Sequence, residues 1–232
     1  MIKPLLKKVL GSLGYTLART ARTPDTLLGL TARPIRTVVD AGANTGQFAR
    51  RARRLFPAAR LHCFEPVPEA FAALSAWAAA DGAVTCHRCA LGDAARRASF
   101  NVHADHPPSS SLLPTTARSH EQWSQTVRQV EIEVEVQTLD AALAGHALET
   151  EILVKLDVQG FEDRVIAGAT ATLERSAACL LEVSVENFYE GQATFLALAT
   201  ALDRVGLRFA GVDDQAVAPD GHVLFFDALF TR

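Results

Sequence analysis

The chain is poor in cysteine, in long apolar runs and in charge of one sign. Its 232 residues include only four cysteines, of which Cys86 and Cys89 form a C-x-x-C pair. Because no second pair completes a zinc site, we interpret the cysteines as free thiols and expect a reducing, cytoplasmic location. The formal net charge of −3 gives no whole-chain case for nucleic acid as a partner, so we expect none.

We also expect neither a transmembrane segment nor a signal peptide. Residues 1–17 alternate lysines with leucines and lack both a long apolar core and a small-residue cleavage site. We interpret residues 1–34 as an N-terminal helical or cap segment, with an amphipathic helix on a membrane or partner surface as the alternative. Residues 35–232 are long enough to bury a full core, so we assign them to one α/β domain.

Short apolar runs alternate along this domain with segments of helical period. The runs predict strands at 35–39, 61–64, 84–90, 152–156, 178–183 and 223–230, and the period predicts helices at 68–80, 161–173 and 194–205. Residues 99–103 and 131–136 alternate as half-exposed strands do. The order predicts a doubly wound, Rossmann-like, mostly parallel sheet, whose ligands lie beyond the carboxyl ends of the strands.

A small-residue turn follows the first strand. Residues 38–46 are VVDAGANTG, so Asp40 precedes a turn with Gly42 and Gly46, and an arginine-rich amphipathic segment follows. A strand, glycine turn and helix in this order let the backbone approach a ligand closely. The second strand ends in Glu65, an acid placed to hydrogen-bond a ribose diol. We therefore interpret residues 38–65 as a nucleoside-binding unit.

The glycine spacing indicates which nucleoside binds. A dinucleotide site has G-x-G-x-x-G, whereas this turn is D-x-G-x-x-x-G. Asp40 would repel a phosphate but could hold a cationic amino group. S-adenosylmethionine carries an adenosine, a ribose diol and an ammonium but no phosphate, so these residues predict it as the cofactor.

Five motifs occur in an order that is typical of one known family: VVDAGANTG at 38–46, FEP at 64–66, ALGD at 90–93, SSSL at 109–112 and KLDVQGFE at 155–162. Over roughly residues 35–230 the chain resembles the FkbM family of class I S-adenosylmethionine-dependent methyltransferases. The resemblance implies the class I methyltransferase fold and O-methylation of a hydroxyl on a secondary metabolite or sugar. The strand ends and the resemblance together give these candidate cofactor-binding residues: Asp40, Gly42, Ala43, Asn44, Gly46, Glu65, Pro66, Ala90, Leu91, Ser111 and Asp157.

Two residues are candidates for the catalytic base, because a sugar or alkyl hydroxyl is a poor nucleophile. Asp157 ends the central strand nearest the expected methyl group, and it could equally hold the ammonium of the cofactor. His106, in an irregular loop, is the second candidate. We expect Lys155, inside the same apolar strand, to pair with Glu182 at the end of the next one.

Three alternatives remain open from the sequence. Asp157, Glu186 and Asn187 could hold Mg²⁺, which would polarise the acceptor hydroxyl, although we assign no metal ligands. The resembling motif usually reads K-x-D-x-E-G-x-E, and Gln159 in place of the glutamate would suit a relative that binds cofactor without catalysis. The oligomeric state is open, a homodimer included.

The longest irregular stretch covers residues 104–119 and is rich in proline and serine. Connections in compact domains are usually short, so a segment of this length is typical of a functional loop. We predict that it is a mobile lid on the acceptor side, with Ser109, Ser110 and Ser111 near the site.

Overall fold

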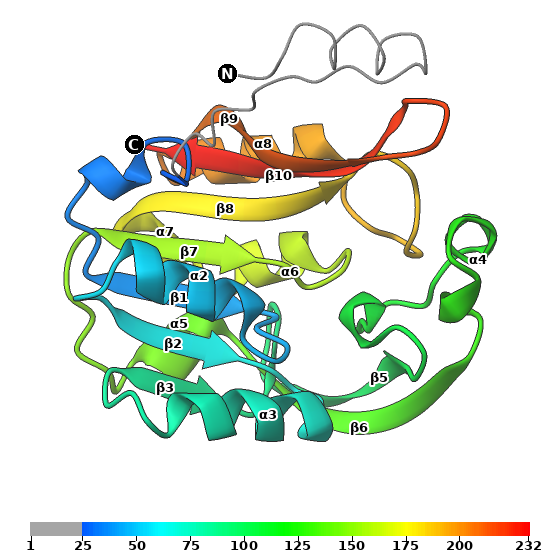
Figure 1. Cartoon of the computed structure of the whole chain (residues 1–232), viewed down its shortest axis with the longest axis horizontal. Coiled ribbons are helices and arrows are strands. Elements are labelled where there is room, and N and C mark those ends of the chain that lie inside the picture. Colours follow the sequence, from blue (N-terminus) through cyan, green and yellow to red (C-terminus); the bar gives the residue numbers. More distant parts are fainter. Residues whose placement is uncertain (1–24) are drawn as a thin grey trace, which may run out of the picture.

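The computed structural model describes residues 25–232, and its centre is one twisted sheet (Figure 1). The strand order is β3-β2-β1-β7-β8-β10-β9. Strands β3, β2, β1, β7 and β8 pair in parallel, and β10 is antiparallel to both of its neighbours. The bounds are β1 Thr37–Ala41, β2 Arg60–Phe64, β3 Val84–His87, β7 Ile152–Leu156, β8 Ser176–Ser184, β9 Arg208–Val217 and β10 Val223–Thr231.

Helices cover both faces of this sheet, because alternate residues of its strands enter two separate cores. On one face α2 (Gln47–Leu55) and α3 (Pro68–Ala78) pack on Val38, Leu61 and Leu153. On the other face the neighbours in sequence, Val39 and Val154, meet α5 (Leu139–Leu143), α6 (Glu162–Ala167), α7 (Thr170–Glu174) and α8 (Phe195–Arg204). This is the doubly wound arrangement that the alternation of strands and helices predicts.

The register of the three middle strands brings the predicted motifs to one edge. Ala41 pairs with Phe64 of β2 and with Leu156 of β7, so the next residues of all three strands leave the sheet side by side. The approach is close at Gly42, where an added Cβ would lie 1.9 Å from the backbone oxygen of Asp157. Gly42 also has a φ of +81°, so no other residue fits this turn without strain.

A second, smaller sheet differs from the expectation of one continuous sheet. Its strands are β4 (Ala90–Leu91), β5 (Arg96–His103) and β6 (Gln129–Gln137), in the order β4-β6-β5. The expected strand at 84–90 therefore divides, because its first half stays in the large sheet while Ala90 and Leu91 pair with β6. Strand β9 was not predicted.

The expected helix at 161–173 is wrong in one respect, since the chain forms two short helices, α6 and α7, with a break between them. Gly168 lies at the break, and a Cβ there would be 2.0 Å from the backbone oxygen of Gly92. Among the described residues no helix is both long and apolar enough to cross a membrane. Of the expected segment 1–34, residues 1–24 lie outside the described part, and Leu27 and Leu30 are buried in the core beside α2.

Candidate functional site

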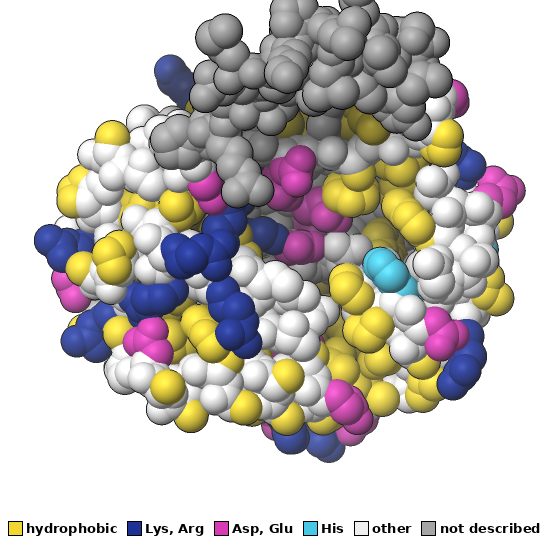
Figure 2. All heavy atoms as spheres, viewed as in Figure 1, with side chains coloured by type: hydrophobic (Ala, Val, Ile, Leu, Met, Phe, Trp, Pro, Cys, Tyr) yellow, Lys and Arg dark blue, Asp and Glu magenta, His cyan; other side chains and the backbone are white. Residues whose placement is uncertain are grey.

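Two adjoining cavities open at the carboxyl edge of the parallel strands. The apolar cavity is enclosed mainly by Phe64, Leu91, Phe100, Leu112 and Phe161, and Glu65 lies at its wall. The polar cavity measures about 510 Å³, within the range of about 300–1,000 Å³ typical of ligand pockets. Asn44 and Asp157 line both cavities. On the face drawn in Figure 2, acidic side chains gather in a hollow beside apolar ones.

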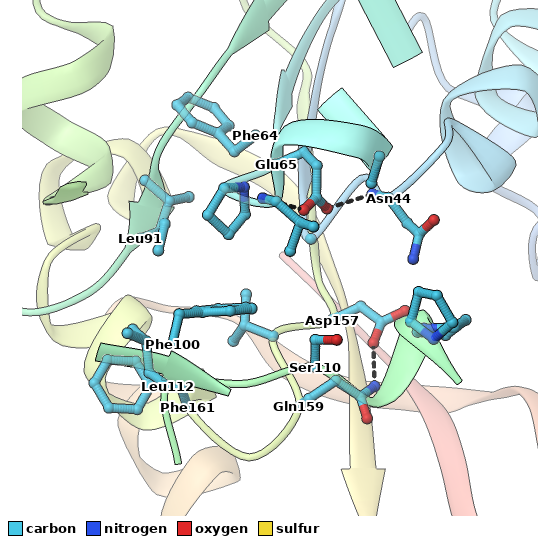
Figure 3. Close-up of a pocket in the computed structure, with 18 of the residues that line it drawn as sticks. Asn44, Phe64, Glu65, Leu91, Phe100, Ser110, Leu112, Asp157, Gln159 and Phe161 are labelled. Atoms are coloured by element: carbon cyan, nitrogen blue, oxygen red, sulfur yellow. Dashed lines mark hydrogen bonds between the residues drawn. The ribbon is translucent and has the colours of Figure 1, made fainter. Parts of the chain in front are cut away.

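Glu65 is fixed at the mouth of the apolar cavity by the turn that follows β1. Its carboxylate accepts hydrogen bonds from the backbone N–H of Asn44 and of Val67, both at 2.8 Å (Figure 3). Burial raises the pKa of Glu65 to about 7, although these two bonds oppose the shift. A carboxylate has about four acceptor positions, so two remain for hydroxyl donors of a ligand.

Asp40 lies in β1 beneath both cavities and lines neither of them. Its side chain is 1% exposed, and among the described residues its carboxylate oxygens have no hydrogen-bond partner. Burial raises the pKa of Asp40 to about 6, and the neighbouring charge of Lys155 opposes this shift. The structure therefore brings Asp157, rather than Asp40, to the cavity wall.

The other candidate cofactor residues are placed on both sides of the cavities. Pro66, Ala90 and Leu91 line the apolar cavity, and Ala43 lines the polar one. Gly46 lines neither; it precedes helix α2 with a φ of +93°, and a Cβ there would meet Leu74 at 3.1 Å. Gly42 lines both.

Asp157 is held at the junction of the cavities from two sides. Lys155 Nζ donates to its Oδ2 at 2.7 Å. Gln159 Nε2 donates to its Oδ1 at 2.7 Å, the bond drawn in Figure 3. Burial opposes the charge of Lys155, but the neighbouring carboxylates, Asp157 first, outweigh it and raise the pKa of the ammonium. The expected pairing of Lys155 with Glu182 is therefore replaced by pairing with the acid two residues further along the chain.

Gln159 connects two of the carboxyl groups that line the polar cavity, those of Asp157 and Glu182. Its Nε2 also donates to Glu182 Oε1 at 2.9 Å, and its Oε1 accepts from the hydroxyl of Tyr189 at 2.6 Å. Burial, reinforced by the charge of Asp157, raises the pKa of Glu182 well above its usual value. An amide uses its donors and its acceptor together in this network, which a carboxylate at residue 159 could not do.

The three residues considered for Mg²⁺ are not brought together. Glu186 accepts hydrogen bonds from the guanidinium of Arg118 and also contacts His222 Nε2 at 2.6 Å. The backbone oxygen of Asn187 accepts from Thr116, and neither Glu186 nor Asn187 lines a cavity with Asp157. The loop after β8 turns these residues toward α4 (Ala117–Gln122) and away from the strand ends.

The loop at 104–119 forms a wall of both cavities. It is more ordered than expected, since it contains a short helix η2 (Pro107–Ser109) and the start of α4. His106 lines the polar cavity, and its Nδ1 lies 2.8 Å from Ser109 Oγ. Ser110 lines the apolar cavity, whereas Ser111 lines neither and donates its hydroxyl to the backbone oxygen of Gln159 at 2.7 Å.

The sequence did not indicate the aromatic walls of the site. Phe100 comes from β5 and Phe161 precedes α6, while Trp123, Phe188 and Phe225 line the polar cavity from three separate segments. Apart from Phe161, which belongs to the motif at 155–162, these residues occur in no motif, and nothing in their spacing connects them. Only the folded chain brings them together.

A family model and two similar curated relatives all indicate the same family of methyltransferases. A model described as the methyltransferase FkbM domain matches residues 40–209. The 2-O-methyltransferase NoeI of Sinorhizobium fredii (strain NBRC 101917 / NGR234) is 31% identical over 188 residues, which cover 76% of this chain and 74% of that protein. The 31-O-demethyl-FK506 methyltransferase FkbM of Streptomyces tacrolimicus is 32% identical over 160 residues, covering 60% of this chain and 62% of that protein.

Among solved structures, the chain is similar to the magnesium protoporphyrin IX methyltransferase (ChlM) from Synechocystis PCC 6803 with bound SAM. The TM-score is 0.47 and the identity 12%, over 97% of this chain and 95% of that one.

Proposed function

The chain belongs to the FkbM methyltransferase family and is an S-adenosylmethionine-dependent methyltransferase, and from this premise we propose that it methylates a hydroxyl of a small molecule. The observation that carries the proposal is the pair of adjoining cavities, which share Asn44 and Asp157 at the carboxyl edge of β1 and β7. One cavity suits a nucleoside and the other a polar acceptor. We further propose residues 35–232 as the catalytic domain.

The chemistry of the apolar cavity supports S-adenosylmethionine as its ligand. Aromatic and aliphatic walls from Phe64, Leu91 and Phe161 suit the flat adenine ring. Glu65, already oriented by two backbone N–H groups, is placed to accept hydrogen bonds from ribose hydroxyls. The bound cofactor would supply a methyl group on a positively charged sulfur, an electrophile that needs no metal.

Asp157 would bind the cofactor's ammonium rather than remove a proton from the acceptor. Both of its oxygens already accept hydrogen bonds, one from the buried ammonium of Lys155 and the other from the amide of Gln159, and these contacts fix the carboxylate in place. Its remaining acceptor positions suit an ammonium donor.

His106 is the residue that we assign to proton removal. It lines the polar cavity, and the contact of its Nδ1 with Ser109 leaves Nε2 to accept the hydroxyl proton as the new carbon–oxygen bond forms. The carboxyl groups of Glu182 and Asp227 and the rings of Trp123 and Phe225 line the same cavity. Acidic acceptors beside apolar rings suit a polyhydroxylated acceptor such as a sugar, and we propose this class.

Calorimetry with S-adenosylmethionine and S-adenosylhomocysteine tests the cofactor site. Glu65→Ala should weaken both affinities by about 1–3 kcal/mol, the cost of losing a charged hydrogen-bond partner, whereas Glu174→Ala on the exposed end of α7 should leave them unchanged. Undiminished binding by Glu65→Ala would refute the assignment of Glu65.

Turnover of labelled cofactor against a panel of sugars and other alcohols tests the reaction. His106→Ala should reduce methyl transfer about 10²–10⁴-fold while S-adenosylhomocysteine still binds. Full activity in this variant would exclude His106 as the base. Binding without turnover of any hydroxylated acceptor would favour the non-catalytic alternative, and activity that disappears with a chelator would favour a metal-dependent reaction.

A further inference from the structure

Three histidines from separate segments meet on the face of the sheet that α5 covers, outside the candidate active site. His62 comes from β2, His87 from β3 and His146 from the turn after α5, elements that lie together in Figure 1. One ring nitrogen of each lies within 4.8 Å of the other two. The segments are 25 and 59 residues apart along the chain, so only the fold creates this cluster.

We propose that His62, His87 and His146 form a binding site for a divalent transition metal, with Zn²⁺ as the ion that fits best. Imidazole nitrogen is a preferred ligand of zinc, and three histidines with a fourth position for water are a known zinc donor set. The proposal is independent of the methyl-transfer function, since none of the three residues lines either cavity.

The distance between the two strand histidines already suits a tetrahedral ion. His62 Nδ1 and His87 Nε2 are 3.3 Å apart. Two nitrogens that bind one Zn²⁺ at about 2.05 Å in tetrahedral geometry are separated by roughly 3.3 Å. The three ring nitrogens lie within 4.8 Å of one another, so His146 must move inward by up to about 1.5 Å, which its exposed position after a five-residue helix allows.

The fold holds the three rings against one another. His62 is 4% exposed, its ring stacks on that of His87 with centroids 5.6 Å apart, and it meets His146 edge-on at 4.8 Å. Neutral imidazole has a lone pair to donate. Arg60 is a neighbouring cation, and it pairs with Glu149 at 3.5 Å, which partly offsets its charge.

The site would join two strands of the sheet to the end of α5. His87 also stacks on Phe64 with ring centroids 4.3 Å apart, and Phe64 lines the apolar cavity. A metal that immobilises His87 would therefore steady one wall of the proposed nucleoside site. Its first effect would be on stability, because the ion binds the folded chain and not the unfolded one.

Isothermal titration of the full chain, prepared without a histidine tag, with Zn²⁺ alone tests the proposal. We expect one ion per chain and a dissociation constant of about 1 μM or lower, and Zn²⁺ should raise the melting temperature. Residues 1–24 contain no His, Cys, Asp or Glu that would add a site. Co²⁺ bound in place of Zn²⁺ should give the intense visible absorption of a four-coordinate ion.

Variants separate this cluster from other histidines. His146→Ala changes an exposed residue, so the fold should persist, and the Zn²⁺ affinity should fall at least about 100-fold; His87→Asn should act in the same direction. His120→Ala is the matched control and should bind like the unaltered chain. No binding by the unaltered chain, or equal binding by His146→Ala, would overturn the proposal. So would loss of binding in His222→Ala, because that residue contacts Asp220 and Glu186 on another part of the surface.

Discussion

Gln159 is the residue whose replacement tests most directly how the polar side of the site is held together. Its amide donates to Asp157 at 2.7 Å and to Glu182 at 2.9 Å, and it accepts from Tyr189 at 2.6 Å. Gln159→Leu removes all three bonds, whereas Gln159→Glu keeps the shape and removes only the donors. The backbone has a φ of +58° in each case, so the strain there is common to all variants.

The size of the effect follows from the three bonds. Hydrogen bonds to charged groups contribute about 1.5–3 kcal/mol each and neutral ones about 1 kcal/mol. Gln159 is half-buried, so water can replace part of each bond, and we expect Gln159→Leu to lower the free energy of unfolding by about 2–3 kcal/mol. For a domain of this size that is a fall of about 5–10 °C in melting temperature.

The effect of Gln159→Glu should depend on pH. A third carboxyl group beside Asp157 and Glu182 has its pKa raised by burial and by like charge. The folded state of the variant then binds more protons than the unfolded state, so its stability relative to the parent chain falls as pH rises above the ordinary glutamate value. At pH 5 the protonated side chain regains one of the two donors, so the variant should be closest in stability to the parent; at pH 8 it should be less stable and bind S-adenosylhomocysteine more weakly.

Thermal unfolding and calorimetry at the two pH values measure both quantities. Gln215→Glu, at an exposed glutamine of β9, adds the same formal charge away from the site and is the control. If Gln159→Glu matched the parent chain in stability and affinity at pH 8, the network would have no energetic role and the reasoning would be wrong.

Three further predictions use other parts of the site. Asp157→Asn should fold and should lose affinity for S-adenosylmethionine along with its turnover; calorimetry that shows full affinity with lost turnover would instead identify Asp157 as the base. Burial raises the pKa of Glu162 to about 7, so the folded state takes up a proton that the unfolded state loses near pH 4.5. The free energy of unfolding of the parent chain should therefore fall as pH rises from about 4.5 to 7. In Glu162→Gln, measured by denaturant unfolding, that fall should be smaller than in the parent by up to about 3 kcal/mol. Hydrogen exchange in residues 104–119 should slow when S-adenosylhomocysteine and acceptor are both bound, and equal exchange would show a connector instead of a lid.

Much of the fold follows from local patterns in the sequence. The apolar runs predicted all five parallel strands of the large sheet and β10 to within a few residues. Strands that are buried on both faces appear in the sequence as short continuous apolar runs, which are easy to locate. Strand β9 escaped prediction because it is an edge strand with many exposed residues, including Phe209 and Val212. The break between α6 and α7 depends on contact between Gly168 and Gly92, which no local pattern records.

The candidate site also has a part that the sequence predicts and a part that it does not. Asp157 and Glu65 end buried strands, so their place at the sheet edge follows from topology. The partner of Lys155 did not follow, since both Asp157 and Glu182 reach this edge and Gln159 donates to both, and only the side-chain geometry pairs Lys155 with Asp157. Sequence order specifies which residues reach the edge, and side-chain hydrogen bonds specify what each one does there.

The charges at the strand ends explain why this edge suits a cationic ligand. Lys155 is a buried cation among the carboxyl groups of Asp40, Asp157, Glu182 and Asp227. Burial raises the pKa of Asp40, Glu182 and Asp227, so without a ligand part of the excess negative charge is removed by protons. A ligand with an ammonium and a sulfonium supplies positive charge in place of those protons, whereas a phosphate would add to the repulsion. The carboxyl cluster therefore favours the nucleoside cofactor that the glycine turn admits by shape.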